Sequence, residues 1–202
     1  MNLPNKITLS RIILTIFIIL LLVFPFEEAG IKLPQLFINE MIVVDIKYPI
    51  AGVLFIVAAL TDMIDGKLAR KNNQVTDLGK MLDAIADKVL VNSVLIIFAA
   101  QGFINVFIPV VIVIRDIVVD AIKMEAASKG RVVAAIKSGK IKTASLMIGL
   151  VLTFIYNLPF EIWNIRVSDF MLYFASIMSI LSAIEYYKLN KNIIFPKEEI
   201  IE

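Results

Sequence analysis

The stretch from Thr61 to Leu90, TDMIDGKLARKNNQVTDLGKMLDAIADKVL, carries carboxylates inside or at the edge of apolar sequence. A first set of positions, spaced three or four residues apart, shares one face of a helix and consists of Asp62, Asp65, Gly66 and Ala69. A second set, spaced four apart, shares a face of the next helix and consists of Gly79, Asp83 and Asp87. An ionised carboxylate in a membrane segment costs several kcal/mol unless it is paired or bound to metal.

Two consecutive helices joined by a short polar stretch pack antiparallel, so the two acidic faces can meet. Four converging carboxylates cannot all stay ionised without cations. Oxygen ligands without nitrogen or sulfur indicate Mg²⁺, Mn²⁺ or Ca²⁺, and two ions about 3.5–4 Å apart suit an in-line phosphoryl displacement. Two other interpretations remain: solvated charges at the membrane surface, and a cation-transporting cluster.

The composition narrows the class of protein. The 202 residues are 59% hydrophobic and 19% charged, with a net charge of +2, which is more apolar and less charged than a soluble domain. A soluble enzyme, a disordered tail and a nucleic-acid-binding module are therefore excluded. The chain has no Cys and no His, which excludes disulfides, thiolate chemistry and imidazole bases.

Six apolar runs predict an all-α integral membrane protein with six transmembrane helices. The runs are Ile12–Phe26, Tyr48–Leu60, Val89–Ala100, Val106–Ile122, Ile141–Leu158 and Asp169–Tyr187. A signal peptide is the alternative for the first run, but Pro25, Phe26, Glu27 and Glu28 make a poor cleavage site. Between the first two runs, Leu36, Phe37, Met41, Val43 and Val44 predict a short interfacial helix.

Basic residues predict the orientation of these spans. Most of the 20 basic residues lie at the N-terminus, in the turns after the second and fourth runs, and in the tail, whereas Lys32, Lys47 and Arg166 lie on the other side. Both termini are therefore expected in the cytoplasm. We expect residues 1–202 to form a single multi-pass domain in a bacterial-type plasma membrane, with its active site facing the cytoplasm.

The acidic stretch resembles the signature of the CDP-alcohol phosphotransferase family at all of its fixed positions, namely Asp62, Asp65, Gly66, Ala69, Arg70, Gly79, Asp83 and Asp87. The resemblance implies six transmembrane helices, a homodimer, two Mg²⁺ or Mn²⁺ ions, and phosphatidyl transfer from CDP-diacylglycerol to an alcohol with release of CMP. It implies metal binding by Asp62, Asp65, Asp83 and Asp87, with Asp87 also the catalytic base. It implies that the donor lipid is bound by Asp62, Gly66, Ala69, Arg70, Thr76 and Gly79.

The rest of the chain resembles the bacterial phosphatidylglycerophosphate synthase branch of that family, whose acceptor is sn-glycerol 3-phosphate. The segments that carry this likeness are residues 1–11, Arg115-Asp116, residues 138–143 and residues 183–187. Lys123 stands where a second Arg is expected eight residues after Arg115, and Lys lacks the bidentate fork of Arg.

A pocket for the acceptor's phosphate is predicted from four cations, Arg115, Lys123, Lys140 and Lys142. Alternatively, Arg115 forms a salt bridge to Asp116 or Asp120, and Lys140 and Lys142 anchor a helix at the cytoplasmic surface. Serine, inositol phosphate or phosphatidylglycerol is the alternative acceptor. Asn5, Thr8 and Arg11 either contact substrate or cap and anchor the first helix.

Overall fold

The computed structural model describes the backbone of residues 3–38, 42–71 and 77–194. It describes side chains for the same residues except 3–6, 62–71, 77–78, 80 and 193–194. The elements in chain order are α1 (Leu3–Val23), β1 (Gln35–Ile38), β2 (Ile42–Asp45), α2 (Lys47–Lys71), α3 (Asp77–Ala100), α4 (Phe107–Ser128), α5 (Lys137–Phe154), the 3-10 turn η1 (Phe160–Trp163) and α6 (Val167–Ile194).

The chain divides into two compact units. The first consists of Met1–Phe103 and Val151–Ile165, and the second of Ile104–Leu150 and Arg166–Glu202. The last turn of α5 therefore belongs to the first unit and the rest of that helix to the second. The prediction of a single domain over residues 1–202 stays a prediction.

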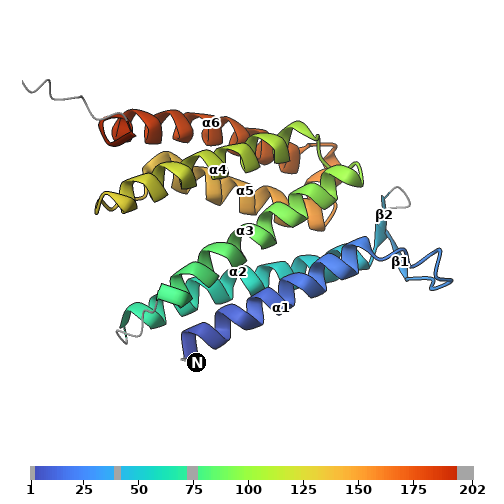
Figure 1. Ribbon diagram of the computed structural model, residues 1–202. Helices are drawn as coiled ribbons and strands as arrows, with labels where there is room; N and C mark the ends of the chain where they lie inside the picture. The colour runs from blue at the N-terminus through green and yellow to red at the C-terminus, as the bar shows by residue number, and fades with distance from the viewer. Residues whose placement is uncertain (1–2, 39–41, 72–76, 195–202) are drawn as a thin grey trace, which may run out of the picture. The chain divides into compact units, whose positions relative to one another are not determined.

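In the first unit, α1 packs against both α2 and α3, and α2 runs back antiparallel to its two neighbours (Figure 1). Three buried aromatic rings form the centre of this unit. The Phe154 ring centroid lies 5.3 Å from that of Phe55 and 4.7 Å from that of Phe98. Gly52 lets α2 come close to Phe154, because a Cβ at residue 52 would lie 2.7 Å from the Phe154 Cβ.

In the second unit, α4 and α6 lie side by side and α5 runs in the opposite direction (Figure 1). Helix α4 ends at Ser128, and Gly130 follows two residues later with a φ of 70°, which suits a glycine. The Arg131 N–H donates to the Ala126 carbonyl at 2.9 Å, which closes the helix end before the chain turns into α5.

The predicted interfacial helix between the first two apolar runs is wrong. Residues 35–38 and 42–45 form two antiparallel strands instead, in which Gln35 pairs with Asp45 and Ile38 with Ile42. Ile42, Val43 and Val44 are β-branched residues that favour extended backbone, and Pro34 precedes the first strand. The predicted contributor Met41 lies outside the described residues.

The six described helices contain the six predicted apolar runs except at three ends, because α1 stops at Val23, α4 begins at Phe107 and α5 stops at Phe154. Each helix exposes large apolar side chains, of which Ile13, Val53, Ile96, Ile117, Ile148 and Phe170 are one from each. By length and composition, one helical stretch of the described chain, Val167–Asn192, could cross a membrane. Two shorter apolar helical stretches are Ile7–Val23 and Lys47–Thr61.

Three buried hydroxyls inside the two units form hydrogen bonds within their own helices. The hydroxyls of Thr15, Ser145 and Ser176 are buried and donate to the backbone carbonyl one turn earlier, at 2.8, 2.8 and 2.9 Å. Apolar exteriors with such self-satisfied polar interiors are typical of helices packed in lipid.

Candidate active site

The acidic face of α3 is the described half of the predicted metal site. Gly79, Asp83 and Asp87 follow one another at one-turn intervals within this helix. The Asp83 side chain is 49% exposed and Asp87 is also exposed, so their oxygens are accessible to a ligand. Both groups offer only hard oxygen donors, which fit Mg²⁺ or Mn²⁺.

The other half of the predicted donor site lies largely outside the described residues. The backbone of α2 includes Asp62, Asp65, Gly66, Ala69 and Arg70, but their side chains are not described, and Thr76 is outside the described residues altogether. Within the described part of the chain, no three acidic residues gather in a group that could hold a metal ion. The four-carboxylate arrangement therefore stays a prediction.

Arg11 contacts the acidic face of α3 directly. It is 2% exposed, and its Nη2 donates to Asp83 Oδ1 at 2.7 Å. Thr8 and Thr15 are buried on either side of it along α1, and the side chain of Asn5 is not described. The structure thus places Arg11 against a candidate metal ligand. The sequence pattern that indicates this contact is the spacing of Thr8, Arg11 and Thr15, which places three polar residues on one face of a mostly apolar helix.

A cavity of about 500 Å³ in the second unit gathers three of the four cations predicted to bind the acceptor. Arg115 and Lys123 come from α4 and Lys140 from the first turn of α5. The remaining lining residues are Ala135, Ile136, Gly139, Thr143, Ala144, Met147 and Tyr186. A cavity lined by three cations is suited to a phosphate group.

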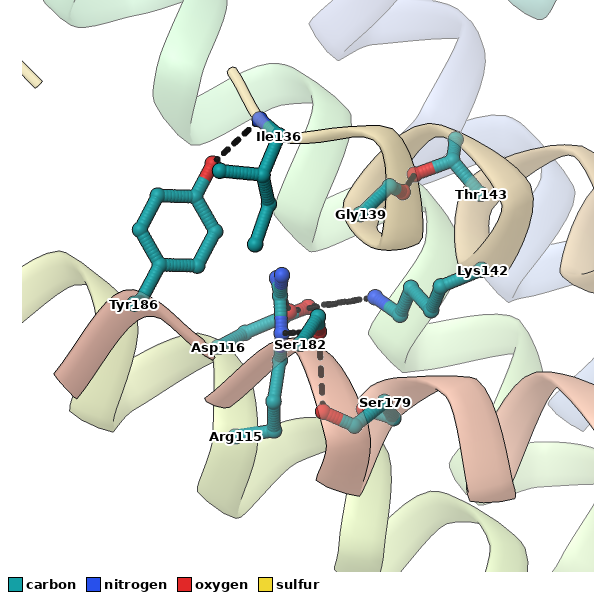
Figure 2. A network of polar contacts seen from close by, with 9 residues as sticks. All are labelled: Arg115, Asp116, Ile136, Gly139, Lys142, Thr143, Ser179, Ser182 and Tyr186. Carbon is teal, nitrogen blue, oxygen red and sulfur yellow. Dashed lines mark hydrogen bonds and ion pairs between the residues drawn. The ribbon is translucent and has the colours of Figure 1, made fainter. Parts of the chain in front are cut away.

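Arg115 is held by neighbours on α4 and α6 (Figure 2). Its Nη1 lies 3.0 Å from Asp116 Oδ1, and its Nε donates to Ser182 Oγ at 2.9 Å. The Arg115 salt bridge to Asp116, one of the two alternatives predicted, is thus present together with the cavity. One carboxylate contact does not occupy a five-donor guanidinium, so binding of the acceptor's phosphate by Arg115 stays a prediction beside the observed salt bridge.

Lys142 is placed differently from the prediction. It is 5% exposed, it is not among the described residues that line the cavity, and its Nζ lies 3.1 and 3.3 Å from the two carboxylate oxygens of Asp116 (Figure 2). Lys140 and Lys142 are two residues apart on a helix, so their side chains point in different directions. Helical spacing therefore puts the two lysines on different faces of α5, and the packing of this helix decides that Lys140 is the one that lines the cavity.

Tyr186 lines the cavity, and in the sequence it is part of residues 183–187, which carry the family resemblance. Its ring lies under two cations, with the Arg115 guanidinium carbon 5.6 Å and the Lys123 Nζ 5.4 Å from its centroid. Its hydroxyl accepts the Ile136 N–H at 3.4 Å, which ties α6 to the start of α5 (Figure 2). A buried aromatic face with this role is not visible in one sequence, because it follows from how α6 packs against α4.

Known proteins match this chain along most of its length. The sequence model of the CDP-alcohol phosphatidyltransferase family matches residues 1–182. A Bacillus subtilis (strain 168) protein named CDP-diacylglycerol–glycerol-3-phosphate 3-phosphatidyltransferase is 37% identical over 193 residues, covering 94% of this chain and 95% of the relative. A Mycoplasma pneumoniae protein of the same name is 34% identical over 164 residues, covering 81% of this chain and 72% of the relative.

A solved structure has the same fold. The crystal structure of Mycobacterium tuberculosis phosphatidylinositol phosphate synthase in apo form matches with a TM-score of 0.61, covering 95% of this chain and 92% of that chain. Its sequence identity of 17% supports the fold alone. The family match over residues 1–182 and the 37% identity to the Bacillus subtilis relative agree with the acidic signature, and this chain therefore belongs to the CDP-alcohol phosphatidyltransferase family.

Proposed function

We propose that this enzyme transfers the phosphatidyl group of CDP-diacylglycerol to sn-glycerol 3-phosphate, which gives phosphatidylglycerophosphate and CMP. The Bacillus subtilis and Mycoplasma pneumoniae relatives carry the name of this activity, and both are more than 30% identical to this chain. The observation in the structure that carries the proposal is the cavity lined by Arg115, Lys123 and Lys140.

The charge of this cavity supports a phosphorylated acceptor. Three cations around one small space repel each other unless an anion enters, and each charge-assisted hydrogen bond contributes about 1.5–3 kcal/mol. Serine has no phosphate group to match them. Inositol phosphate has one, but no contact in the cavity favours its ring, and the names of the relatives favour glycerol 3-phosphate. A cation transporter is not favoured either, because a cationic cavity has no role in it.

For the donor, we propose that Asp62, Asp65, Asp83 and Asp87 hold two Mg²⁺ or Mn²⁺ ions. Asp83 and Asp87 fit, since they present accessible oxygens one turn apart on α3. Divalent cations bound there would neutralise the charge of the diphosphate. Gly66, Ala69 and Gly79 leave room for the cytidine nucleotide, and Arg70 and Thr76 contact it.

The chemical step follows from the residues of the chain. Asp87 accepts the proton of the primary hydroxyl of glycerol 3-phosphate. That oxygen forms a bond to the lipid-linked β-phosphorus while the bond from this phosphorus to the CMP oxygen breaks in line, and CMP leaves as the anion. Arg115, Lys123 and Lys140 bind the phosphate of the acceptor.

We further propose that all six helices span the membrane, with both termini and the active site on the cytoplasmic side, and that the enzyme is a homodimer. Large apolar side chains exposed on every described helix support the spans. The basic residues Lys67, Arg70 and Lys71 at the end of α2, and Lys129 and Arg131 just after α4, support the orientation.

The test is CMP release by the purified enzyme from CDP-diacylglycerol and Mg²⁺, with one acceptor at a time. The acceptors are glycerol 3-phosphate, serine, inositol, inositol phosphate and phosphatidylglycerol. We expect release with glycerol 3-phosphate alone, and thin-layer chromatography should identify phosphatidylglycerophosphate. Release with inositol phosphate or serine and none with glycerol 3-phosphate would contradict the proposal while leaving the family assignment intact.

A further inference from the structure

Ser182 on α6 forms an ordered hydrogen-bond chain that ends on Arg115. Its side chain is fully buried, its hydroxyl donates to the Ser179 carbonyl at 2.8 Å, and its Oγ accepts from Arg115 Nε at 2.9 Å (Figure 2). A serine hydroxyl has one hydrogen, and here it is directed to the carbonyl. The lone pairs of Oγ are therefore left for Arg115, so that the direction of this contact is fixed.

Asp116 fixes the opposite edge of the same guanidinium. Its Oδ1 lies 3.0 Å from Arg115 Nη1 and 3.1 Å from Lys142 Nζ. The opposite charges of Asp116 and Lys142 form an ion pair inside the unit, where the side chain of Lys142 is 6% exposed and that of Asp116 16% exposed. Arg115 therefore keeps its net positive charge for the cavity.

The third nitrogen of the Arg115 guanidinium, Nη2, lies beside the cavity wall. A Cβ on Gly139 would lie 3.4 Å from Arg115 Nη2, and both residues line the cavity. The guanidinium carbon lies 5.6 Å from the Tyr186 ring centroid, so the plane of the group is also covered on one face. Nε and Nη1 thus have partners within the protein, and Nη2 is the part of the fork closest to Gly139.

The geometry points to Ser182 as a positioning residue for the acceptor. It holds the Arg115 fork in the orientation that meets a phosphomonoester, so that binding does not have to order a long, mobile side chain. Ser182 acts through Arg115 and does not itself line the cavity among the described residues. This inference rests on the proposed function, in that the acceptor carries a phosphate.

The matched pair of variants is Ser182→Ala and Ser179→Ala. Both serines are fully buried on α6, but the Ser179 hydroxyl makes no hydrogen bond to any described residue. For Ser182→Ala we expect the KM for glycerol 3-phosphate to rise roughly 3–10-fold, with the KM for CDP-diacylglycerol changed less than about twofold. Ser179→Ala should leave both constants at the wild-type value. Thermal unfolding in detergent should show that both variants are folded, with Ser182→Ala the less stable because it leaves Arg115 Nε without its partner.

Arg115→Lys provides the second arm, because lysine has no Nε–H to donate to Ser182. If Ser182 acts only through Arg115, adding Ser182→Ala to Arg115→Lys changes the acceptor KM less than about twofold, as the energetic coupling is lost. A persisting 3–10-fold effect in that background overturns the inference. So does a rise of both substrate KM values, or an effect no larger than that of Ser179→Ala. Wild-type enzyme that ignores glycerol 3-phosphate but uses another acceptor overturns the proposed function instead.

Discussion

Arg11 is a buried cation in an apolar helix, and its partner is a candidate metal ligand. Its Nη2 lies 2.7 Å from Asp83 Oδ1, while the Asp83 side chain remains 49% exposed. A buried arginine needs such a partner, because an uncompensated charge inside a protein is costly. The partially exposed carboxylate retains oxygen lone pairs for another ligand, so Arg11 can orient Asp83 without removing it from the site.

Arg11→Ala should therefore reduce both folding stability and activity. We expect a loss of about 1–3 kcal/mol in the free energy of unfolding, since the variant leaves a void and an unpaired carboxylate that is only partly buried. Thermal unfolding in detergent and CMP release measure the two effects. Arg166→Ala is the control, as the Arg166 side chain is 79% exposed and lies 3.8 Å from Asp169. Equal effects of the two substitutions would show that Arg11 has no special role.

Lys140 and Lys142 should separate binding from stability. Lys140→Met removes a cation that lines the cavity, so the KM for glycerol 3-phosphate should rise about tenfold at unchanged thermal stability. Lys142→Met removes the buried partner of Asp116 and should lower the free energy of unfolding by about 1–3 kcal/mol. Kinetics and thermal unfolding on both variants check this, and a reversed pattern would mean that Lys142 is the acceptor's ligand.

At the scale of the elements, the apolar runs predicted the helices well, because long apolar stretches have few alternatives to a helix. The segment between the first two runs was misassigned as a helix. Each strand has only four residues, and in such short segments β-branched residues and a preceding proline favour a strand more than a loose apolar pattern favours a helix. The pairing of β1 with β2 decides between strand and helix. The partners of Arg115 could not be predicted for a similar reason, since Ser182 lies 67 residues further along the chain, on another helix.

The acidic face of α3 predicts metal-dependent activity. EDTA should abolish CMP release, and Mg²⁺ or Mn²⁺ should restore it, because hard oxygen ligands bind these ions. Asp83→Asn and Asp87→Asn should each lower kcat at least about 100-fold, as expected for a lost ligand or base. Glu125→Gln is the control, because Glu125 is exposed on α4 and pairs with Lys129. Full turnover in excess EDTA would reject a metal site.

The close contact of α5 with α6 depends on Gly149. A Cβ at this position would lie 2.8 Å from the Leu172 Cγ and 3.3 Å from its backbone nitrogen, so α6 has to move. Gly149→Ala should cost about 1–3 kcal/mol in the free energy of unfolding through overpacking. Ile148→Ala, at an exposed neighbouring position, should cost less than half as much in the same thermal unfolding experiment. Wild-type stability of Gly149→Ala would mean that the two helices tolerate a wider separation.

At the scale of the whole molecule, the predicted site residues divide into an acidic half and a cationic half, whose described members belong to different units. Asp83 and Asp87 lie in the first unit, and Arg115, Lys123 and Lys140 lie in the second. The family signature predicted the acidic half, because it depends on local helical spacing. The cationic half could be predicted only as a set of charges, since which lysine faces the cavity depends on packing between α4, α5 and α6.

The orientation of the whole chain is open to a clean test, because the protein has no Cys and single-cysteine variants carry no background. Lys32→Cys reports on the exposed loop before β1, and Val132→Cys reports on the loop between α4 and α5, where Val132 is 97% exposed. With a thiol reagent that does not cross membranes, intact bacterial cells should label residue 32 and not residue 132, as the positive-inside rule predicts for the basic loop. Permeabilised cells should label both, which controls for access. Labelling of residue 132 alone in intact cells would reverse the predicted orientation and place the cationic cavity's loop outside the cell.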